Sequence, residues 1–499
     1  MVKEEDPGVL PQAEQIAGEF DIPAADIQRI TRHFVAQLRD GLVNERTWQL
    51  PAYVRSIPTG TERGQYLAVD LGGSNCRICL VNLRGDSRFD VIQSKHSVPS
   101  HVMVNTSYRP LFDFIAQKIS DFLELHPGSY SLGFTFSFTC EQTSLASGRL
   151  IRWDKGWDIP EAIGRDPCVL LQEAVDRKGL PVRVAVLAND SVGTLLTRSY
   201  TSGPETSTLA AIIFGTGTNA AYVEKLSNIK RLGTASDEEG IMVMNTEWGS
   251  LDERMEVLPR TSFDDELDEA SIDPGSQMLE KRVSGLYLGE LLRLAIRRLD
   301  HLGVLDMTMG EKTCCIDSSF LSKLAASNID SAIRLIQDTL SAEKVSRHDA
   351  KAIQLISRSI ARRAARLAGA SLASLIIQSG RLEQTPKRPR CHSRVESFWR
   401  RISLLCNRVI TFIGLWLRGK PLIQLKGSKT YGEAIDIAAD GSLIEFYPTF
   451  EDDMRAALRE LPQFGAAGEQ RVRISLAKDG SGVGAALMAQ AASATAHDC

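Results

Sequence analysis

Polar residues cluster in a short turn between two apolar runs, and their types suit the binding of a phosphate. Residues 66–81 read YLAVDLGGSNCRICLV, in which Gly72 and Gly73 predict the tight loop of a β-hairpin. Glycines let a phosphate approach backbone N–H groups, while hydroxyl and guanidinium groups add hydrogen bonds and charge. A carboxylate beside the turn could hold a hydrated Mg²⁺. The polar side chains at this turn are Asp70, Ser74, Asn75 and Arg77.

This turn differs from two familiar phosphate motifs. It lacks the third glycine that opens a helix in the dinucleotide fingerprint, and no Gly-Lys-Ser/Thr follows as in a P-loop. A purely structural hairpin is therefore the alternative interpretation. A second glycine-rich stretch, residues 479–484, is predicted to be a turn between a strand and a helix of small residues. Through Gly480 and Ser481 it is a second candidate cradle for a phosphate or nucleoside, although most such turns are only turns.

A further set of polar residues stands where predicted strands end, and its members suit a polyhydroxylated ligand. Each sugar hydroxyl is both a donor and an acceptor, so amides and carboxylates match pairs of neighbouring hydroxyls. Taken singly, each residue is more often a polar loop residue or a helix cap. Their joint recurrence favours a sugar site. The set comprises Ser137, Lys155, Asn189, Asp190, Asn219, Asn245–Gly249, Gln277 and Glu280.

The elements that position these residues follow from hydrophobic periodicity, and strands alternate with helices as in α/β folds. A predicted helical region at 12–45 is interrupted near Pro23. Other expected helices cover 110–125, 274–299 and 355–377. Expected strands cover 131–137, 182–188, 207–214 and 471–477.

Composition limits the class of protein. A chain of 499 residues with 43% hydrophobic and 24% charged residues should fold around more than one core. A net charge of −4 gives no reason to expect nucleic acid or an anionic membrane as the main partner. Nine cysteines scattered along the chain indicate a reducing compartment. The acidic start lacks the apolar core of a secretory signal, and no apolar run approaches the roughly 20 residues of a membrane helix.

Residues 381–430 differ from the rest of the chain. They are rich in Lys and Arg, poor in acids, and include the apolar run 409–417. A basic amphipathic surface helix and a disordered insertion are the two interpretations, and composition favours the insertion.

The ordered motifs closely resemble those of the eukaryotic hexokinase family. The turn at 67–77 is similar to the family's first phosphate motif, and 214–219 (FGTGTN) to its second. Segments 132–138 and 152–157 resemble the sugar-binding region, and 187–194 (LANDSVGT) the segment with the catalytic aspartate. The resemblance covers about residues 15–380 and 431–490. The remaining matching segments are 245–249, 258–261, 284–290, 440–442 and 478–485.

The resemblance implies a two-lobed α/β protein of the actin-like ATPase, ribonuclease-H-like fold, with sugar and ATP in the cleft between the lobes. The implied function is an ATP-dependent hexose kinase that transfers the γ-phosphate of MgATP to the 6-hydroxyl of glucose or a related hexose, the first step of glycolysis. A cytoplasmic monomer or weak homodimer is expected, with ATP and Mg²⁺ but no resident metal site. The expected divisions are an N-terminal helical segment on the large lobe at 1–58, the small lobe at 59–188, the large lobe at 189–485 and a C-terminal helix or tail at 486–499.

The resemblance also implies a role for each matching residue. Asp190 is the general base that takes the proton of the 6-hydroxyl, assisted by Lys155. Lys95 reaches the transferring phosphate. The residues expected to hold the sugar are Ser137, Asp154, Lys155, Asn189, Asn219, Glu247, Gln277 and Glu280. Those expected to hold ATP are Asp70, Gly72, Gly73, Ser74, Asn75, Arg77, Lys95, Thr216, Gly480 and Ser481.

Several positions depart from the family pattern. Thr139 replaces a proline and should loosen the loop that presents Ser137. Asp154 replaces the threonine before Lys155, and its extra charge should pair with that lysine, repel the γ-phosphate and weaken turnover. Milder changes are Cys76, Ala220 and Ser276, and the family has no counterpart of 381–430, which suggests a translated intron or a lineage-specific insertion.

These departures leave a second hypothesis open. A catalytically impaired hexokinase-like regulator of carbon-source signalling would bind sugar or nucleotide, with nuclear or mitochondrial-surface pools. A different actin-fold ATPase or a scaffold is the third class.

Overall fold

The computed structural model describes residues 8–497 except positions 74, 154–155, 205, 234, 236–237, 306–315, 343 and 384–433. One compact unit holds Met1–Leu382 and Ile435–Cys499, and it carries both main sheets. Only the first and last residues of the second unit, Glu383–Ala434, belong to the described part. The predictions for 381–430 therefore lie almost entirely outside the described residues.

A five-stranded sheet presents the predicted hairpin. Its strand order is β4-β3-β2-β5-β8, with β2 and β3 antiparallel and β2, β5 and β8 parallel. Asp70 lies directly opposite Arg77 in the hairpin register. Because side chains alternate along a strand, Leu67, Val69 and Leu71 enter the core formed with the outer helices, while Ala68 joins the core on the other face. The strands are β2 (Arg63–Gly72), β3 (Asn75–Arg84), β4 (Phe89–Ser97), β5 (Tyr130–Phe136) and β8 (Val182–Ala188), and the outer helices are α4 (Arg109–Leu125) and α5 (Pro167–Arg177).

A six-stranded sheet presents the second phosphate segment. Its order is β1-β11-β10-β9-β12-β13, with β12 parallel to both neighbours and the other pairs antiparallel. The predicted strands at 207–214 and 471–477 are confirmed as β9 and β13. The strands are β1 (Leu50–Pro51), β9 (Thr208–Phe214), β10 (Thr218–Lys225), β11 (Ile241–Asn245), β12 (Ile435–Asp440) and β13 (Val472–Leu476).

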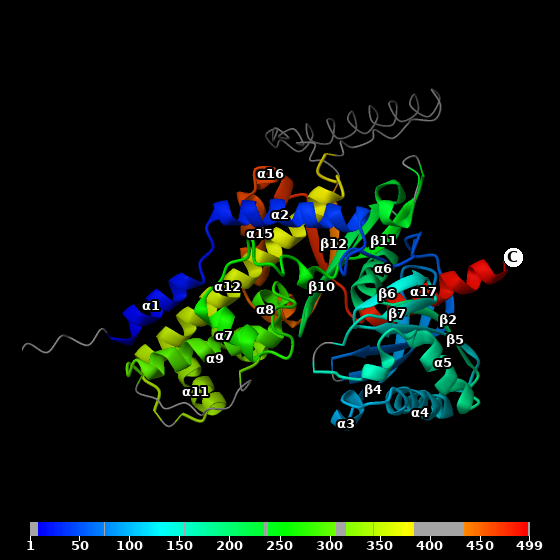
Figure 1. Cartoon of the computed structure of the whole chain (residues 1–499), viewed down its shortest axis with the longest axis horizontal. Coiled ribbons are helices and arrows are strands. Elements are labelled where there is room, and N and C mark those ends of the chain that lie inside the picture. Colours follow the sequence, from blue (N-terminus) through cyan, green and yellow to red (C-terminus); the bar gives the residue numbers. More distant parts are fainter. Residues whose placement is uncertain are drawn as a thin grey trace, which may run out of the picture. The chain divides into compact units, whose positions relative to one another are not determined.

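Two helices form the layer that joins the sheets. α6 (Asp190–Ser202) and α17 (Gly480–His497) contact each other (Figure 1). Their apolar side chains share one core with both sheets. The contact is very close, since a Cβ on Gly484 would lie 2.1 Å from the Cα of Gly193. The glycine-rich stretch predicted to be a turn is therefore the first turn of a helix. The expected division at 485/486 falls inside α17.

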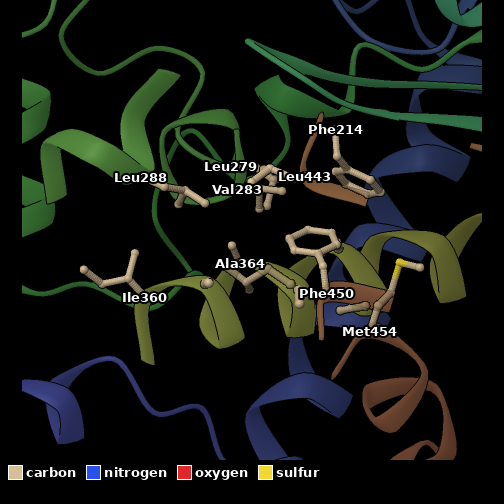
Figure 2. Close-up of a cluster of buried hydrophobic side chains, with 14 of the residues drawn as sticks. Phe214, Leu279, Val283, Leu288, Ile360, Ala364, Leu443, Phe450 and Met454 are labelled. Atoms are coloured by element: carbon tan, nitrogen blue, oxygen red, sulfur yellow. The ribbon is translucent and has the colours of Figure 1, made fainter. Parts of the chain in front are cut away.

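The outer face of the six-stranded sheet is covered by helices packed on α12 (Arg347–Gln378). α1 (Val9–Glu19) and α2 (Ala24–Val43) lie against α12, and the interruption near Pro23 is confirmed (Figure 1). The predicted helix at 274–299 is wrong at its start, because helical structure begins only with α8 (Glu280–Val283) and resumes in α9 (Gly285–His301). Figure 2 shows Leu279 and Val283 pointing toward Ala364 of α12 and Phe450. This packing fixes α8 against the core.

The remaining elements complete the covering of the sheets. They are α3 (Ser100–Met103), β6 (Cys140–Ser144), β7 (Ser147–Leu150), α7 (Ser262–Ala270), α10 (Ser318–Ala326), α11 (Ile329–Leu340), α14 (Ser442–Phe446), α15 (Phe450–Glu460) and α16 (Gly465–Glu469), with short 3₁₀ turns at Pro160–Ala162, Leu226–Asn228, Lys230–Leu232 and Trp248–Ser250. Among the described helices, none is long and apolar enough to span a membrane.

Candidate active site

A cavity of about 600 Å³ lies where the ends of both sheets and the N-termini of α6 and α17 meet. Its volume lies in the range of small-molecule sites. It brings together residues that are up to 411 positions apart in the chain, such as Asp70 and Ser481. The predicted site residues that line it are Asp70, Gly72, Gly73, Asn75, Arg77, Lys95, Ser137, Asn189, Asp190, Thr216, Asn219, Glu247, Gln277, Glu280 and Ser481.

Four residues with an expected role in sugar or ATP binding are not among these, and neither are Asn245, Thr246, Trp248 and Gly249 of the predicted polar set. Ser74, Asp154 and Lys155 lie outside the described residues, so the roles expected for them stay predictions. Gly480 lies against α6 instead, where a Cβ would be 2.7 Å from the hydroxyl of Thr194 and its carbonyl accepts a hydrogen bond from Thr197. The absence of a side chain at this position permits close helix packing, which the local sequence does not reveal.

The hairpin and the start of α17 form one hydrogen-bonded cluster. The guanidinium of Arg77 donates to the Asp70 carboxylate, with a distance of 3.0 Å from Nε to Oδ2. The hydroxyl of Ser481 donates to the same oxygen at 2.7 Å and accepts from Arg77 at 2.9 Å. Asp70 is 7% exposed, so its charge is held by two neighbours rather than by water. The cluster places a guanidinium and a helix N-terminus together at one end of the cavity, where anions are favoured.

A network of amides and one carboxylate forms another part of the site. The side-chain nitrogen of Asn219 donates to the Asn245 oxygen at 2.9 Å and lies 3.3 Å from Glu247 Oε1. Asn245 donates to the same Glu247 oxygen at 2.8 Å. Asn189 caps α6 by accepting from the Ser191 N–H at 2.9 Å. These bonds hold the polar groups in fixed positions, as recognition of a polyhydroxylated ligand requires.

Glu280 and Gln277 are positioned by the short segment before α9. The Glu280 carboxylate accepts the backbone N–H of Thr218 at 2.8 Å, which ties α8 to β10. Gln277 has a left-handed backbone with φ of +52°, and Glu247 has one with φ of +46°. Non-glycine residues adopt this conformation only where surrounding contacts impose it. Both side chains line the cavity, so the strained positions coincide with the site.

Asp190 occupies the first position of α6, at the base of the cavity. Its carboxylate accepts the N–H of Ser191 at 2.7 Å. The N-terminus of a helix is a position at which a negative charge is favoured.

Asp440 also lines the cavity, and our sequence interpretation did not include it among the site residues. The pKa of Asp440 is raised to about 6; burial is the main cause and the charge of Asp190 adds to it, while the Gly441 N–H and the charge of Arg77 act in the opposite direction. The available signal was its place at the end of a buried strand, β12, within an Asp-Gly pair. The other cavity residues missing from that interpretation are Gln93, Phe138, Thr139, Ile213, Gly217, Thr218 and Leu286.

The charge of the cavity wall bears on the form of its ligand. Among the described lining residues, the carboxylates are Asp70, Asp190, Glu247, Glu280 and Asp440, and the basic groups are Arg77 and Lys95. This excess of negative charge disfavours a bare triphosphate and favours one that carries a divalent cation. Within the described part of the chain, no group of three or more metal-ligating side chains forms a closed site.

Thr139, the residue that departs from the family's proline, is 1% exposed. Its backbone carbonyl accepts a hydrogen bond from Ile151 at 2.9 Å, whereas its buried hydroxyl has no hydrogen-bond partner among the residues that the structure describes. A buried hydroxyl without a partner destabilises the folded state because it has lost its water.

Replacing Thr139 with valine should therefore raise the free energy of unfolding by about 1 kcal/mol, since the substitution removes the hydroxyl and keeps the side-chain shape. Thr135→Val is the matched control. Thr135 is 0% exposed and its hydroxyl donates to the Ser481 carbonyl at 3.0 Å, so the same change should destabilise the protein. Urea denaturation of both variants measures the difference. A loss of stability in Thr139→Val would show that its hydroxyl is satisfied in solution.

The fold and the cavity together define a class of protein. Two sheets joined by α6 and α17, each with a glycine-containing hairpin at a shared polar cleft, characterise the two-lobed kinases of the actin-like ATPase fold. A hexokinase from Schistosoma mansoni, solved in complex with glucose, has the same fold with a TM-score of 0.80 and 28% identity, and covers 98% of this chain and 100% of its own.

The chain belongs to the hexokinase family and is an ATP-dependent hexose kinase. Two hexokinase family models match residues 12–200 and 209–491. The chain is 40% identical to a glucokinase of Aspergillus niger, over 97% of each sequence. It is 34% identical to glucokinase-1 of Saccharomyces cerevisiae, over 96% of this chain and 97% of the yeast protein. Near-complete matches to named kinases do not favour the regulator hypothesis.

Proposed function

We propose that the protein phosphorylates glucose, or a closely related hexose, at its 6-hydroxyl with MgATP as donor. The observation that carries this proposal is the cavity itself, which is lined by an ordered network of amides and a carboxylate, by the cluster of Asp70, Arg77 and Ser481, and by Asp190. Similar proteins are named glucokinases, and one solved relative is described with glucose bound. These names support glucose as the preferred hexose.

In this mechanism each wall of the cavity has one task. Asn189, Asn219, Glu247, Gln277 and Glu280 hold the sugar hydroxyls, together with Ser137. Asp190 accepts the proton of the sugar's 6-hydroxyl while the hydroxyl oxygen attacks the γ-phosphorus of ATP. Arg77, the N–H groups at the start of α17, Thr216 and Lys95 stabilise the phosphate oxygens. Positioning and charge stabilisation supply most of the rate in such transfers, because the phosphoryl group itself is loosely bonded in the transition state.

The residues present fit a Mg²⁺ ion that arrives with the nucleotide. Kinases usually bind this ion through one or two carboxylates, waters and substrate phosphates rather than through a protein cage. Asp440 and Asp70 would hold it through its waters. Asp440 is the better supported of the two, because the Asp70 carboxylate already accepts hydrogen bonds from Arg77 and Ser481. When bound, the ion would neutralise charge on the transferring phosphate.

The division into lobes is part of the same proposal. The five-stranded sheet lies within 59–188, and α6 and most of the six-stranded sheet within 189–485. The N-terminal helices pack on α12, which supports assigning residues 1–58 to the large lobe. We further propose a cytoplasmic monomer or weak homodimer. The buried thiols of Cys76, Cys79 and Cys168, which form no disulfide, support a reducing compartment.

A coupled ADP-release assay on the purified full chain tests the proposal. We expect ADP release that depends on glucose and on Mg²⁺, and that disappears when EDTA removes the metal. Other hexoses added in parallel rank the sugar preference. ADP release that is the same with and without sugar would contradict a hexose kinase, and sugar binding without any turnover would instead support the regulator.

A further inference from the structure

Gln277 reaches the cavity only because its backbone adopts an unusual conformation. Its φ of +52° lies in the left-handed region, which an L-residue other than glycine rarely occupies. The position lies three residues before Glu280, the first residue of α8, and Gln277 is 5% exposed at the cavity wall. Some contact must hold this conformation, because an extended or right-handed backbone would point the side chain elsewhere.

The contact that holds it comes from Glu253. The backbone N–H of Gln277 donates to Glu253 Oε1 at 3.0 Å, across 24 residues of chain. This is a hydrogen bond to a charged acceptor, which is stronger than one to a neutral group. On the other side, the carbonyl of Gln277 accepts from the N–H of Lys281 at 3.0 Å, as the first turn of helix begins. The bond with Lys281 thus holds the carbonyl side of Gln277, and Glu253 holds its N–H side.

Glu253 itself stands on a rigid loop. The neighbouring Asp252 is 1% exposed, and its carboxylate accepts the N–H groups of Glu256, Val257 and Leu258 at 2.7–2.9 Å. The N–H of Asp252 donates to the side chain of Gln37 on α2 at 3.0 Å. The loop that carries Glu253 is thus tied both to itself and to α2.

The side-chain amide of Gln277 packs tightly against Gly249. A Cβ on Gly249 would lie 2.4 Å from Gln277 Oε1, so the amide rests directly on the backbone of the turn that follows Glu247. The N–H of Leu279 donates to the Gly249 carbonyl at 3.2 Å and keeps the two segments together. The amide can occupy this position only if the backbone of Gln277 stays in place.

We propose that Glu253 is a positioning residue for the hexose site, which acts by holding Gln277 in the conformation that presents its amide to the sugar. This inference rests on the proposed contact between Gln277 and the hexose. Glu253 does not line the cavity, and its role is geometric. An oxygen acceptor at this position is therefore what the site requires, rather than a negative charge.

Four single variants of the full chain test this role, with the Michaelis constant for glucose and the turnover number measured at saturating MgATP. Glu253→Met, which keeps the length but lacks an acceptor, should raise KM for glucose about tenfold and change kcat little. Glu253→Gln keeps an oxygen acceptor and should stay within about twofold of the wild type. Glu253→Asp retains the charge but is too short, and should resemble the methionine variant. Glu256→Met, an exposed glutamate of the same loop, is the matched control and should leave both constants unchanged.

The results for these variants distinguish a positioning role of Glu253 from a general loss of stability and from an error in the proposed sugar contact. A general loss of stability would lower the melting temperature and the active fraction without raising KM for glucose alone. Gln277→Ala should raise KM, and adding Glu253→Met to it should cause little further loss. If Gln277→Ala raises KM and Glu253→Met does not, Glu253 has no positioning role although Gln277 binds sugar. If Gln277→Ala leaves KM unchanged, the proposed sugar contact itself is wrong. A Glu253→Asp variant with wild-type KM would also overturn the inference.

Discussion

Replacing Asp190 with asparagine should lower kcat by at least about 10²–10⁴-fold and leave glucose affinity nearly unchanged. Asparagine has the same shape and can keep the hydrogen bond with the Ser191 N–H, but its amide cannot accept the proton of the 6-hydroxyl. The sugar-binding amides of Asn189 and Asn219 are untouched. Turnover is measured by ADP release and glucose binding by calorimetry.

The control is Asp452→Asn, which makes the same change at an exposed position of α15 and should behave as the wild type. A near-normal kcat in Asp190→Asn would exclude the general-base role. Loss of glucose binding together with turnover would show that Asp190 mainly holds the substrate.

Replacing Arg363 with methionine should lower the free energy of unfolding by about 3–5 kcal/mol. Arg363 and Asp264 are almost fully buried and share two hydrogen bonds of 2.7 and 2.8 Å between α12 and α7. Removing the guanidinium leaves a carboxylate inside the protein with much of its charge uncompensated. Arg362→Met is the matched control, because the guanidinium of Arg362 is exposed and lies 3.7 Å from the exposed Asp21. The control should change stability by less than about 1 kcal/mol.

The same pair predicts how stability depends on pH. Burial alone would raise the pKa of Asp264, but Arg363 outweighs it and Arg282 adds to the effect, so the pKa falls to about 2 from the usual 3.8. A carboxyl whose pKa is lower in the folded state stabilises the protein above its unfolded pKa. That contribution is lost as the pH falls from about 4 through about 2. Urea denaturation between pH 2 and 6 measures it, and the Arg363→Met variant should show a weaker dependence. An equal acid response in both proteins would contradict this account.

Sequence periodicity predicted those helices and strands whose pattern of apolar residues, glycines and prolines lies within the element itself. The strand at 182–188 and the hairpin of residues 66–81 are present, and Pro23 separates two helices as expected. Motif order also predicted most of the cavity, because residues at strand ends converge whenever parallel strands share an edge.

The failures have a common physical cause, which is contact between distant segments. The helix expected from residue 274 begins only at Glu280, because Glu253 and Gly249 hold the intervening segment in an irregular path. Gly480 suggested a phosphate turn, whereas it lies against Thr194, 286 positions earlier. Asp440 was missed because its importance depends on burial and on Asp190, neither of which the local sequence reveals.

The place of α17 in the chain has a consequence for biosynthesis. This helix lies between the two sheets and shares a core with both, yet it follows every strand of both sheets in sequence. A nascent chain that has reached residue 479 therefore contains the strands of both sheets, but of the two helices between them it contains only α6. Ala68, Val81, Ala211 and Val243 then lack part of their covering on the shared face. Exposed apolar surface of this kind binds chaperones and promotes aggregation. We therefore expect the nascent chain to be prone to aggregation until α17 has been synthesised and covers these residues.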